Sequence, residues 1–479
     1  MTSMRRPFAR FLVVGVAAAV ALAACGGGSS KGASNTTGGG GTKSNLPSCP
    51  VHALDTAKGP VSITMWHSMT RANEDTLKKL TNQFNASQTK VHVNLVNQTS
   101  YTDTLTKFTA GLSNHQLPDV VQGEEIALQE LIDTQAILPV QSCVDAEKYD
   151  TSDFVARAIK YFTVNNVLYA MPFNVSNPVL YYDKTAFTAA GLDPNKPPTT
   201  LDELKRDSQI IVSKNVRKYG IALHTDGWFI EQWLAKAGVP FVNNGNGRVK
   251  RATAVTFGGA EGLNLFTWLS DMVKSGLAVS TGSGPSSIDH YLDVGNQVAA
   301  MTIDTSAALG TISLVLGQGQ FAKVQLAVGP MPGPQGNGGV LIGGGALYIS
   351  KSSSPEKQAA AWEFLKFLDT AQSQSTWSAG TGYVPIRKSA TTLAPLSTLW
   401  QQKPYYRVAY DQLLGGAVND ATAGPVIGPY GAKGVGVRGA VIDALDAMLT
   451  QKVPPPTALQ DAVTNSNKAL TSYNQRIGG

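Results

Sequence analysis

Hydrophobic and polar positions alternate along the chain with two different periods. Residues 61–66 (VSITMW) and 91–97 (VHVNLVN) alternate apolar and polar side chains with the period of two that a half-buried strand requires. Between them, Leu77, Leu80 and Phe84 recur at the spacing of one helix face. This order predicts a β-α-β unit. Strands and helices continue to alternate further along, which is typical of an α/β fold.

Two later segments carry the signals of a helix start. Thr200 is followed three residues later by Glu203, the spacing of a capping box, and an apolar-faced run comes next. Ser354 and Pro355 precede a second such run, EKQAAAWEFLKFL. We therefore expect a helix to begin at each position.

The first residues resemble a bacterial lipoprotein signal peptide. The basic stretch MTSMRRPFAR is followed by FLVVGVAAAVALAA, which is short for a bilayer span, and then by Cys25. Residues 22–25 (LAAC) match a lipobox, which implies cleavage before Cys25 and a diacylglycerol on its thiol. A plain secretory signal is the alternative. We expect a signal peptide over 1–24 and a flexible Gly/Ser-rich tether over 25–58.

Length and charge narrow the range of functions. The chain has 479 residues, of which 43% are apolar, enough for a large core and two or three compact units. Its formal charge is +6, but Arg5, Arg6 and Arg10 lie in the predicted signal peptide, which leaves 6 − 3 = +3. This balance is too weak to indicate a nucleic-acid partner.

The remaining cysteines are expected to form a disulfide. With Cys25 as the lipid site, Cys49 and Cys143 are left, and an exported chain meets an oxidising compartment. Two free thiols are the alternative. The six histidines are scattered and there is no HExxH or CxxC motif, so we expect neither a metal nor a cofactor.

Five longer segments carry a family resemblance. They are MWHSM (65–69), PFNVSNPVLYYDKTAFTAAGLDPNKPPTTLDEL (172–204), AAMTIDTS (299–306), IGGGALYIS (342–350) and TGYVPI (381–386). In this order they resemble an extracellular solute-binding protein of an ABC importer, most closely the members that bind glycerol-3-phosphate or glycerophosphodiesters. The likeness extends over about residues 59–470.

The resemblance implies an α/β, two-lobed periplasmic-binding-protein fold (type II, maltose-binding-protein-like) with strands that cross a hinge. It implies lobe 1 over 59–171 plus about 304–349, and lobe 2 over 172–303 plus about 350–479 with the C-terminal helices. A small-molecule ligand would be held between the lobes and delivered to ABC permease subunits in the membrane. We expect a monomer, exported and anchored by its lipid to the outer face of the cell membrane.

The expected ligand is a glycerophosphodiester, such as glycerophosphocholine, or glycerol-3-phosphate. A mono- or oligosaccharide is the alternative. Nine ligand-binding positions follow from the resemblance: Tyr101, Glu125, Ser176, Trp228, Thr305, Ser306, Gly344, Tyr383 and Arg438.

Each of these residue types suits a glycerol phosphate. The Glu125 carboxylate can accept hydrogen bonds from vicinal hydroxyls, with Glu124 as the alternative contact. The Arg438 guanidinium can place two donors on phosphate oxygens. Thr305 or Ser306, at the start of a helix-like run, can bind an anion through a hydroxyl and free amides. Gly344 lacks a Cβ, so backbone can approach the ligand there.

An exported hydrolase is the competing class of function. Hydrolysis needs a paired acid and base, a metal cluster or an activated nucleophile, and we find no GxSxG nucleophile elbow, because the GSSKG match at residues 28–32 lies in the predicted tether. Glu124 and Glu125, if helical, point about 100° apart and make a poor catalytic pair. Residues 434–439 satisfy GxGxxG but lie near the C-terminus after a Pro/Gly loop, unlike a dinucleotide site. We therefore expect no catalytic residues.

Overall fold

The computed structural model describes residues 45–478, except 115, 285–286, 317–320, 322, 430 and 432–433. The predicted signal peptide, the lipid site at Cys25 and the tether up to residue 44 lie outside the described residues. All described residues belong to one compact unit. Within them, no helix combines the length and the apolar character that crossing a membrane demands.

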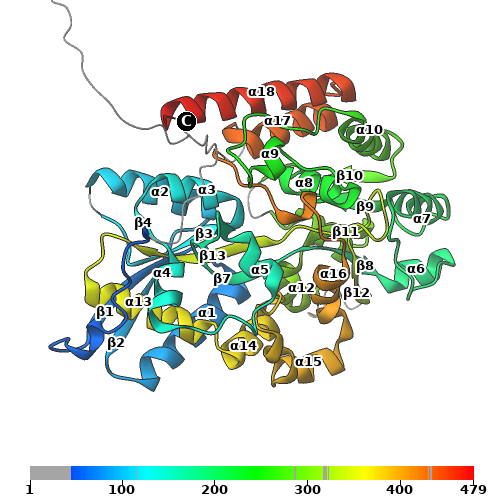
Figure 1. Cartoon of the computed structure of the whole chain (residues 1–479). Coiled ribbons are helices and arrows are strands. Elements are labelled where there is room, and N and C mark those ends of the chain that lie inside the picture. Colours follow the sequence, from blue (N-terminus) through cyan, green and yellow to red (C-terminus); the bar gives the residue numbers. More distant parts are fainter. Residues whose placement is uncertain are drawn as a thin grey trace, which may run out of the picture. The chain divides into compact units, whose positions relative to one another are not determined.

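Two sheets organise this unit (Figure 1). The first has the strand order β2-β1-β3-β13-β4, with β7 also paired to β13. Its strands are β1 (Val61–His67), β2 (Val91–Asn97), β3 (Val120–Glu124), β4 (Ile137–Leu138), β7 (Met171–Ser176) and β13 (Gly343–Ser350). The second has the order β10-β9-β11-β8-β12. Its strands are β8 (Pro178–Asp183), β9 (Tyr219–Leu223), β10 (Ala278–Ser280), β11 (Ala299–Thr305) and β12 (Leu326–Pro330). We call the two halves lobe 1 and lobe 2. A small hairpin joins β5 (Thr163–Val164) to β6 (Val167–Leu168).

The predicted β-α-β unit forms the edge of the first sheet. Strand β1 pairs in parallel with β2, with Val61 opposite Val91. Helix α1 (Arg71–Ser87) connects them and buries Leu77, Leu80 and Phe84, the three positions whose spacing predicted it. Burying this apolar stripe is what stabilises an amphipathic helix against a sheet.

Helices around the first sheet pack on it or on one another. They are α1, α2 (Tyr101–Asn114), α3 (Leu128–Asp133), α4 (Val140–Glu147), α5 (Ala156–Tyr161), α12 (Leu309–Leu316), α13 (Pro355–Leu368) and α14 (Ala371–Thr381). Helix α13 begins where predicted, because the Ser354 side chain accepts from the Lys357 amide and Pro355 occupies the first turn.

The remaining helices pack on the second sheet, on one another or, in the case of the helix at Leu396–Gln402, on α14. They are α6 (Lys184–Ala190), α7 (Leu201–Ser213), α8 (Gly227–Ala237), α9 (Asn243–Asn246), α10 (Ala260–Lys274), α11 (Asp289–Gly295), α15 (Leu396–Gln402), α16 (Val408–Gly415), α17 (Gly436–Thr450) and α18 (Pro455–Arg476). The capping box of Thr200 and Glu203 is present at the start of α7. Helices α17 and α18 lie side by side in Figure 1 and both contact α10.

The chain crosses from one sheet to the other at Asn177, between β7 and β8. The Asn177 side chain donates to the Ala409 carbonyl over 2.8 Å and accepts from the Gln412 amide over 2.8 Å. Its own carbonyl accepts from the Ser306 amide. The polar residues before the apolar β8 strand therefore satisfy a buried crossing, where an unpaired polar group would be costly.

The predicted boundaries of the lobes need correction in three places. Residues 172–176 of strand β7 lie in the range that we assigned to lobe 2, but β7 pairs with β13 in the first sheet. Strand β12 lies in the range 304–349 that we assigned to lobe 1, but it pairs with β8 in the second sheet. Helices α13 and α14 lie in the range from 350 that we assigned to lobe 2, but they pack against β1 and α1. Long-range strand pairing and packing decide these placements, and no local sequence pattern carries that information.

Cys49 and Cys143 are joined by a disulfide with an S–S distance of 2.01 Å. Both residues are buried, and Cys143 lies on α4. The bond connects Cys49, which lies inside the range 25–58 that we predicted as a tether, to the body of lobe 1 across a sequence separation of 94 residues. The end of that range also forms a short 3-10 helix, Ala53–Asp55, that contacts α13, so the part from residue 45 belongs to the folded unit and not to a flexible tether.

Candidate ligand-binding site

A cavity of about 300 Å³ lies between the two lobes. From lobe 1 it is lined by Thr70 and Arg71 at the start of α1, by Tyr101 at the start of α2, and by Tyr383. From lobe 2 it is lined by residues after β9, on α11 and at the end of β11: His224, Asp226, Tyr291, Asp304 and Thr305. Three of the nine predicted ligand-binding residues, Tyr101, Thr305 and Tyr383, therefore share this cavity.

Tyr101 and Tyr383 meet Asn174 at the lobe 1 wall. The Tyr101 hydroxyl lies 2.6 Å from the Asn174 amide group. With the amide turned so that its oxygen faces the tyrosines, Tyr101 donates over 2.6 Å and Tyr383 over 3.2 Å. Burial raises the pKa of both tyrosine hydroxyls above the usual value, so both stay protonated. They are hydrogen-bonding groups positioned at the cavity.

The sequence left open whether Thr305 or Ser306 contacts the ligand, and the two residues lie in different surroundings. Thr305 lines the cavity, and its hydroxyl accepts from the Ala307 amide over 3.2 Å as the N-cap of the short 3-10 helix η4 (Ser306–Ala308). The Ser306 hydroxyl is buried and finds no partner among the residues that the structure describes. A buried hydroxyl left unpaired is costly, which makes Ser306 a candidate for a partner from a ligand.

The partners of the Arg438 guanidinium differ most from those that we expected. Its Nε and Nη2 atoms donate to the two carboxylate oxygens of Glu231, each over 2.8 Å. Nη2 also donates to Glu125 over 3.1 Å and Nη1 to Glu124 over 3.4 Å. The two-donor fork that we expected on a phosphate is thus occupied by a carboxylate of α8, because α8 and α17 pack together.

Glu125 is buried within this same cluster of three carboxylates and one guanidinium, which we call the Arg438 cluster. Burial raises the pKa of the Glu125 carboxyl to about 8. The Glu124 and Glu231 carboxylates push this pKa in the same direction, and Arg438 opposes them. Glu125 therefore holds its proton at neutral pH more readily than an exposed glutamate.

Trp228, Ser176 and Gly344 lie where α8 meets the paired strands β7 and β13. A Cβ added at Gly343 would come within 2.3 Å of the Trp228 ring, so the indole packs directly on the strand. Ser176 is buried opposite Gly343. Gly344 has a φ of +88°, and a Cβ there would lie 1.9 Å from the Asn174 carbonyl. Close strand packing thus requires this glycine, whether or not a ligand approaches it.

The cavity also contains residues that the sequence did not reveal. His290 Nε2 lies 2.7 Å from Asp304 Oδ2, and the Tyr291 hydroxyl donates to the same oxygen. The His224 ring stacks on His290 with 5.1 Å between centroids. Burial would raise the pKa of Asp304, but the bond to His290 and the charges around it hold this pKa below its usual value. These residues come from three separate elements, so no motif links them.

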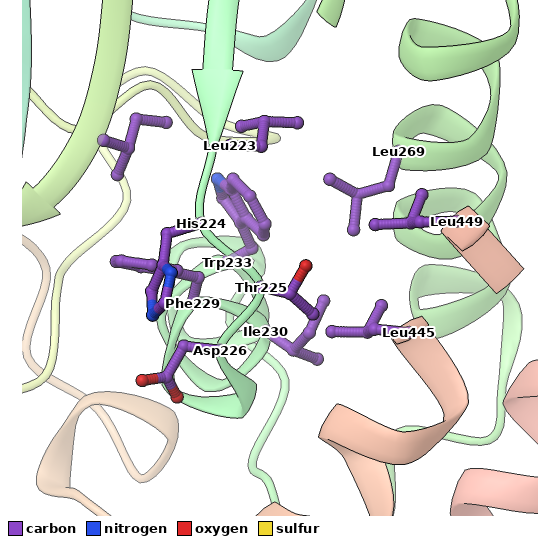
Figure 2. Close-up of a pocket in the computed structure, with 11 residues that line it drawn as sticks. Leu223, His224, Thr225, Asp226, Phe229, Ile230, Trp233, Leu269, Leu445 and Leu449 are labelled. Carbon is purple, nitrogen blue, oxygen red and sulfur yellow. The ribbon is translucent and has the colours of Figure 1, made fainter. Parts of the chain in front are cut away.

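His224 and Asp226 also border a second, apolar pocket within lobe 2. Figure 2 shows the two polar side chains on one side and Leu269, Leu445 and Leu449 facing them from α10 and α17. Ile230 and Trp233 of α8 complete this wall. The loop after β9 therefore lies between an apolar pocket and the polar cavity.

Among the described side chains, no group of three or more His, Cys, Asp and Glu could hold a metal ion.

The two-lobed fold and a polar cavity between the lobes define a protein that binds a small molecule. The profile of the bacterial extracellular solute-binding protein family matches residues 79–406, and the chain belongs to this family. It is a solute-binding protein of an ABC importer, which acts outside the cytoplasm, and not an enzyme.

Among named relatives, the chain is similar to the sn-glycerol-3-phosphate-binding periplasmic protein UgpB of Escherichia coli (strain K12). The two are 28% identical over 434 residues, which cover 88% of this chain and 95% of that protein. The fold resembles UgpB from Mycobacterium tuberculosis in complex with glycerophosphocholine, with a TM-score of 0.72, 20% identity and coverage of 87% and 100%. It also resembles maltose-bound MalE3 of T. maritima, with a TM-score of 0.70, 19% identity and coverage of 85% and 99%. The predicted maltose-binding-protein-like fold is confirmed.

Proposed function

We propose that this protein captures a glycerophosphodiester, such as glycerophosphocholine, or glycerol-3-phosphate between its lobes and delivers it to an ABC permease. The observation that carries the proposal is the similarity to a glycerol-3-phosphate-binding protein over 88% of the chain. Tyr101, Thr305 and Tyr383, expected at the ligand from that resemblance, line one cavity, which supports the same conclusion.

The mechanism follows from the two-lobed architecture. The ligand touches the lobe 1 wall at the two tyrosines and the lobe 2 wall at Thr305, so it stabilises the arrangement in which both walls contact it. Rotation about the crossing near Asn177 opens the cleft, and closure presents a defined surface to the permease. The described cavity, at about 300 Å³, is at the lower end of the range for small-molecule sites.

A sugar is the second candidate ligand. The contacts of Arg438 favour this candidate. Its guanidinium donors already bind three carboxylates and do not face the cavity. Neutral hydroxyl groups would find acceptors and donors in the same cavity without needing a cation. The likeness to maltose-bound MalE3 is compatible with either ligand, since it concerns the fold.

The proposal extends to the attachment of the protein. The LAAC sequence at residues 22–25 supports lipidation of Cys25 and anchoring to the outer face of the cell membrane. The protein would then act as a monomer on a tether. Metabolic labelling with a radioactive fatty acid tests this: the full chain should be labelled, and Cys25→Ser should not.

Calorimetric titration tests the choice of ligand. Residues 45–479 are titrated in parallel with glycerophosphocholine, glycerol-3-phosphate, maltose and trehalose. The proposal predicts tight binding of a phosphate-bearing ligand. Binding of a disaccharide alone would keep the transport role and overturn the proposed ligand.

A further inference from the structure

Arg71 is the cation of the interlobe cavity. It is the first residue of α1, and its side chain is exposed at the cavity wall. Among the described residues that line the cavity, it is the only lysine or arginine. It forms no ion pair with any residue that the structure describes. A guanidinium that faces a ligand cavity and is not neutralised is available for an anion.

The groups beside Arg71 suit an anion as well. Arg71 follows Thr70, whose side chain does not cap the helix, and the amides at the start of a 17-residue helix carry the positive end of its dipole. The hydroxyls of Tyr101 and Tyr383 lie on the same wall, and each can donate to an anion by turning its proton away from the Asn174 amide oxygen. This end of α1 also reaches the other lobe, because the Asn73 side chain donates to the Ala307 carbonyl over 3.2 Å.

The opposite wall of the cavity, in lobe 2, carries carboxylates and no lysine or arginine among its described residues. Asp304 binds His290 and Tyr291 through one oxygen, and accepts from the Thr305 amide over 2.6 Å through the other. Asp226 accepts from the Trp228 amide over 2.9 Å as the N-cap of α8. Both carboxylates line the cavity, and while Asp304 is paired with His290, Asp226 has no ion pair with a described residue and would repel an anion on the lobe 2 wall. The charge distribution therefore favours the lobe 1 end.

The Arg438 cluster is a poor competitor for the same anion. One guanidinium there faces three carboxylates, of which Glu231 already takes two hydrogen bonds. A phosphate would have to displace a buried carboxylate and leave that charge unpaired, which is strongly unfavourable.

We propose that Arg71 binds the anionic group of the ligand. The inference rests on the proposed function in one respect, that the ligand carries a phosphate. The guanidinium donates to a phosphate oxygen, with the start of α1 and the tyrosine hydroxyls around it, and the uncharged or cationic remainder points to the carboxylates of lobe 2.

Three variants of residues 45–479 test the proposal by calorimetry with glycerophosphocholine and glycerol-3-phosphate. Arg71→Gln removes the charge, and Arg71→Lys keeps a charge without the planar fork. Lys79→Gln is the control, because Lys79 is an exposed cation on the same helix and does not line the cavity. Thermal unfolding confirms that all three fold.

A charge-assisted hydrogen bond contributes about 1.5–3 kcal/mol, so Arg71→Gln should weaken binding about 10- to 100-fold. Arg71→Lys should recover part of the affinity, and Lys79→Gln should match the unmodified protein. If Arg71→Gln binds like Lys79→Gln while the unmodified protein binds both phosphate ligands, this inference is wrong and the proposed function stands. If the unmodified protein binds neither, both are wrong.

Discussion

Arg438 of α17 donates a 3.1 Å hydrogen bond to Glu125, which directly follows strand β3 of the first sheet. Because α17 packs with α8 of the second lobe, this bond connects the two lobes at a buried position. The same guanidinium binds Glu231 from its own lobe. The Arg438 cluster is therefore part of the framework that holds the lobes together, and the next two predictions depend on its residues.

Replacing Arg438 should destabilise the fold. Arg438→Met leaves the Glu231 carboxylate buried without its cation and takes a hydrogen-bond donor from Glu125, and breaking such a buried pair costs roughly 3–5 kcal/mol. The measurement is the free energy of unfolding in urea. Arg407→Met is the control, because Arg407 pairs with Asp411 at an exposed position and should change stability by less than about 1 kcal/mol. An equal, small effect of both variants would contradict the importance of the cluster.

Glu125 should make stability fall as pH rises. Its pKa is about 8 in the folded protein, against an ordinary value of 4.5, so between these values the folded state binds more protons than the unfolded state. The free energy of unfolding therefore decreases with increasing pH in this range, by up to about 1.4 kcal/mol per pH unit.

Glu125→Gln should remove this component, so its unfolding free energy should change less steeply between pH 5 and pH 8 than that of the unmodified protein. Urea unfolding at a series of pH values measures the difference. The exposed Glu261, on α10, provides the matched control Glu261→Gln, which should keep the original slope. Identical slopes in all three proteins would show that Glu125 titrates normally.

Gly344 should be required for folding. Gly344→Ala places a Cβ 1.9 Å from the Asn174 carbonyl in addition to the strain of a φ of +88°. Gly238→Ala is the control, because Gly238 has a φ of +78° but nothing within 4 Å of the added Cβ. Backbone strain alone costs about 1–2 kcal/mol, and the clash should make Gly344→Ala clearly worse. Thermal unfolding measures both; equal losses would argue against the packing role.

The tyrosine hydroxyls should matter for ligand affinity and little for the fold. Tyr101→Phe and Tyr383→Phe each remove a hydroxyl from the cavity wall, which should weaken binding of the ligand by about 2- to 10-fold. Tyr169→Phe is the control, because Tyr169 does not line the cavity. Calorimetry with glycerophosphocholine measures the change. Unaltered affinity in both cavity variants would place the ligand elsewhere.

Removing the disulfide should lower stability. The bond between Cys49 and Cys143 closes a loop with a sequence separation of 94 residues, and such bonds typically contribute about 2–4 kcal/mol. Cys49→Ser with Cys143→Ser should lower the free energy of unfolding by this amount. Reducing agent should destabilise the unmodified protein equally and leave the double variant unchanged. A reductant effect on the double variant would point to another cause.

Local patterns in the sequence predicted local structure correctly. The spacing of Leu77, Leu80 and Phe84 predicted α1, and Thr200 with Glu203 predicted the start of α7. Each signal lies within one helix or one turn. The family resemblance added the two-lobed fold, and it pointed to Tyr101 and Tyr383, which line the cavity.

Contacts between residues far apart in the sequence could not be predicted from such local patterns. Glu231 and Arg438 are 207 residues apart, and nothing in either segment indicates that the fork of one meets the carboxylate of the other. His224, His290 and Asp304 come together from a loop, a helix and a strand. The placement of β12 and α13 likewise depends on tertiary pairing, which is why the predicted lobe boundaries needed correction.

A crystal structure of residues 45–479 grown with excess glycerophosphocholine tests the central claim most directly. The account predicts ligand density in the cavity between the lobes, with the phosphate next to Arg71 and the tyrosine hydroxyls within hydrogen-bonding distance. Density for the ligand at another place, or an empty cavity at saturating ligand, would contradict the assignment of this site.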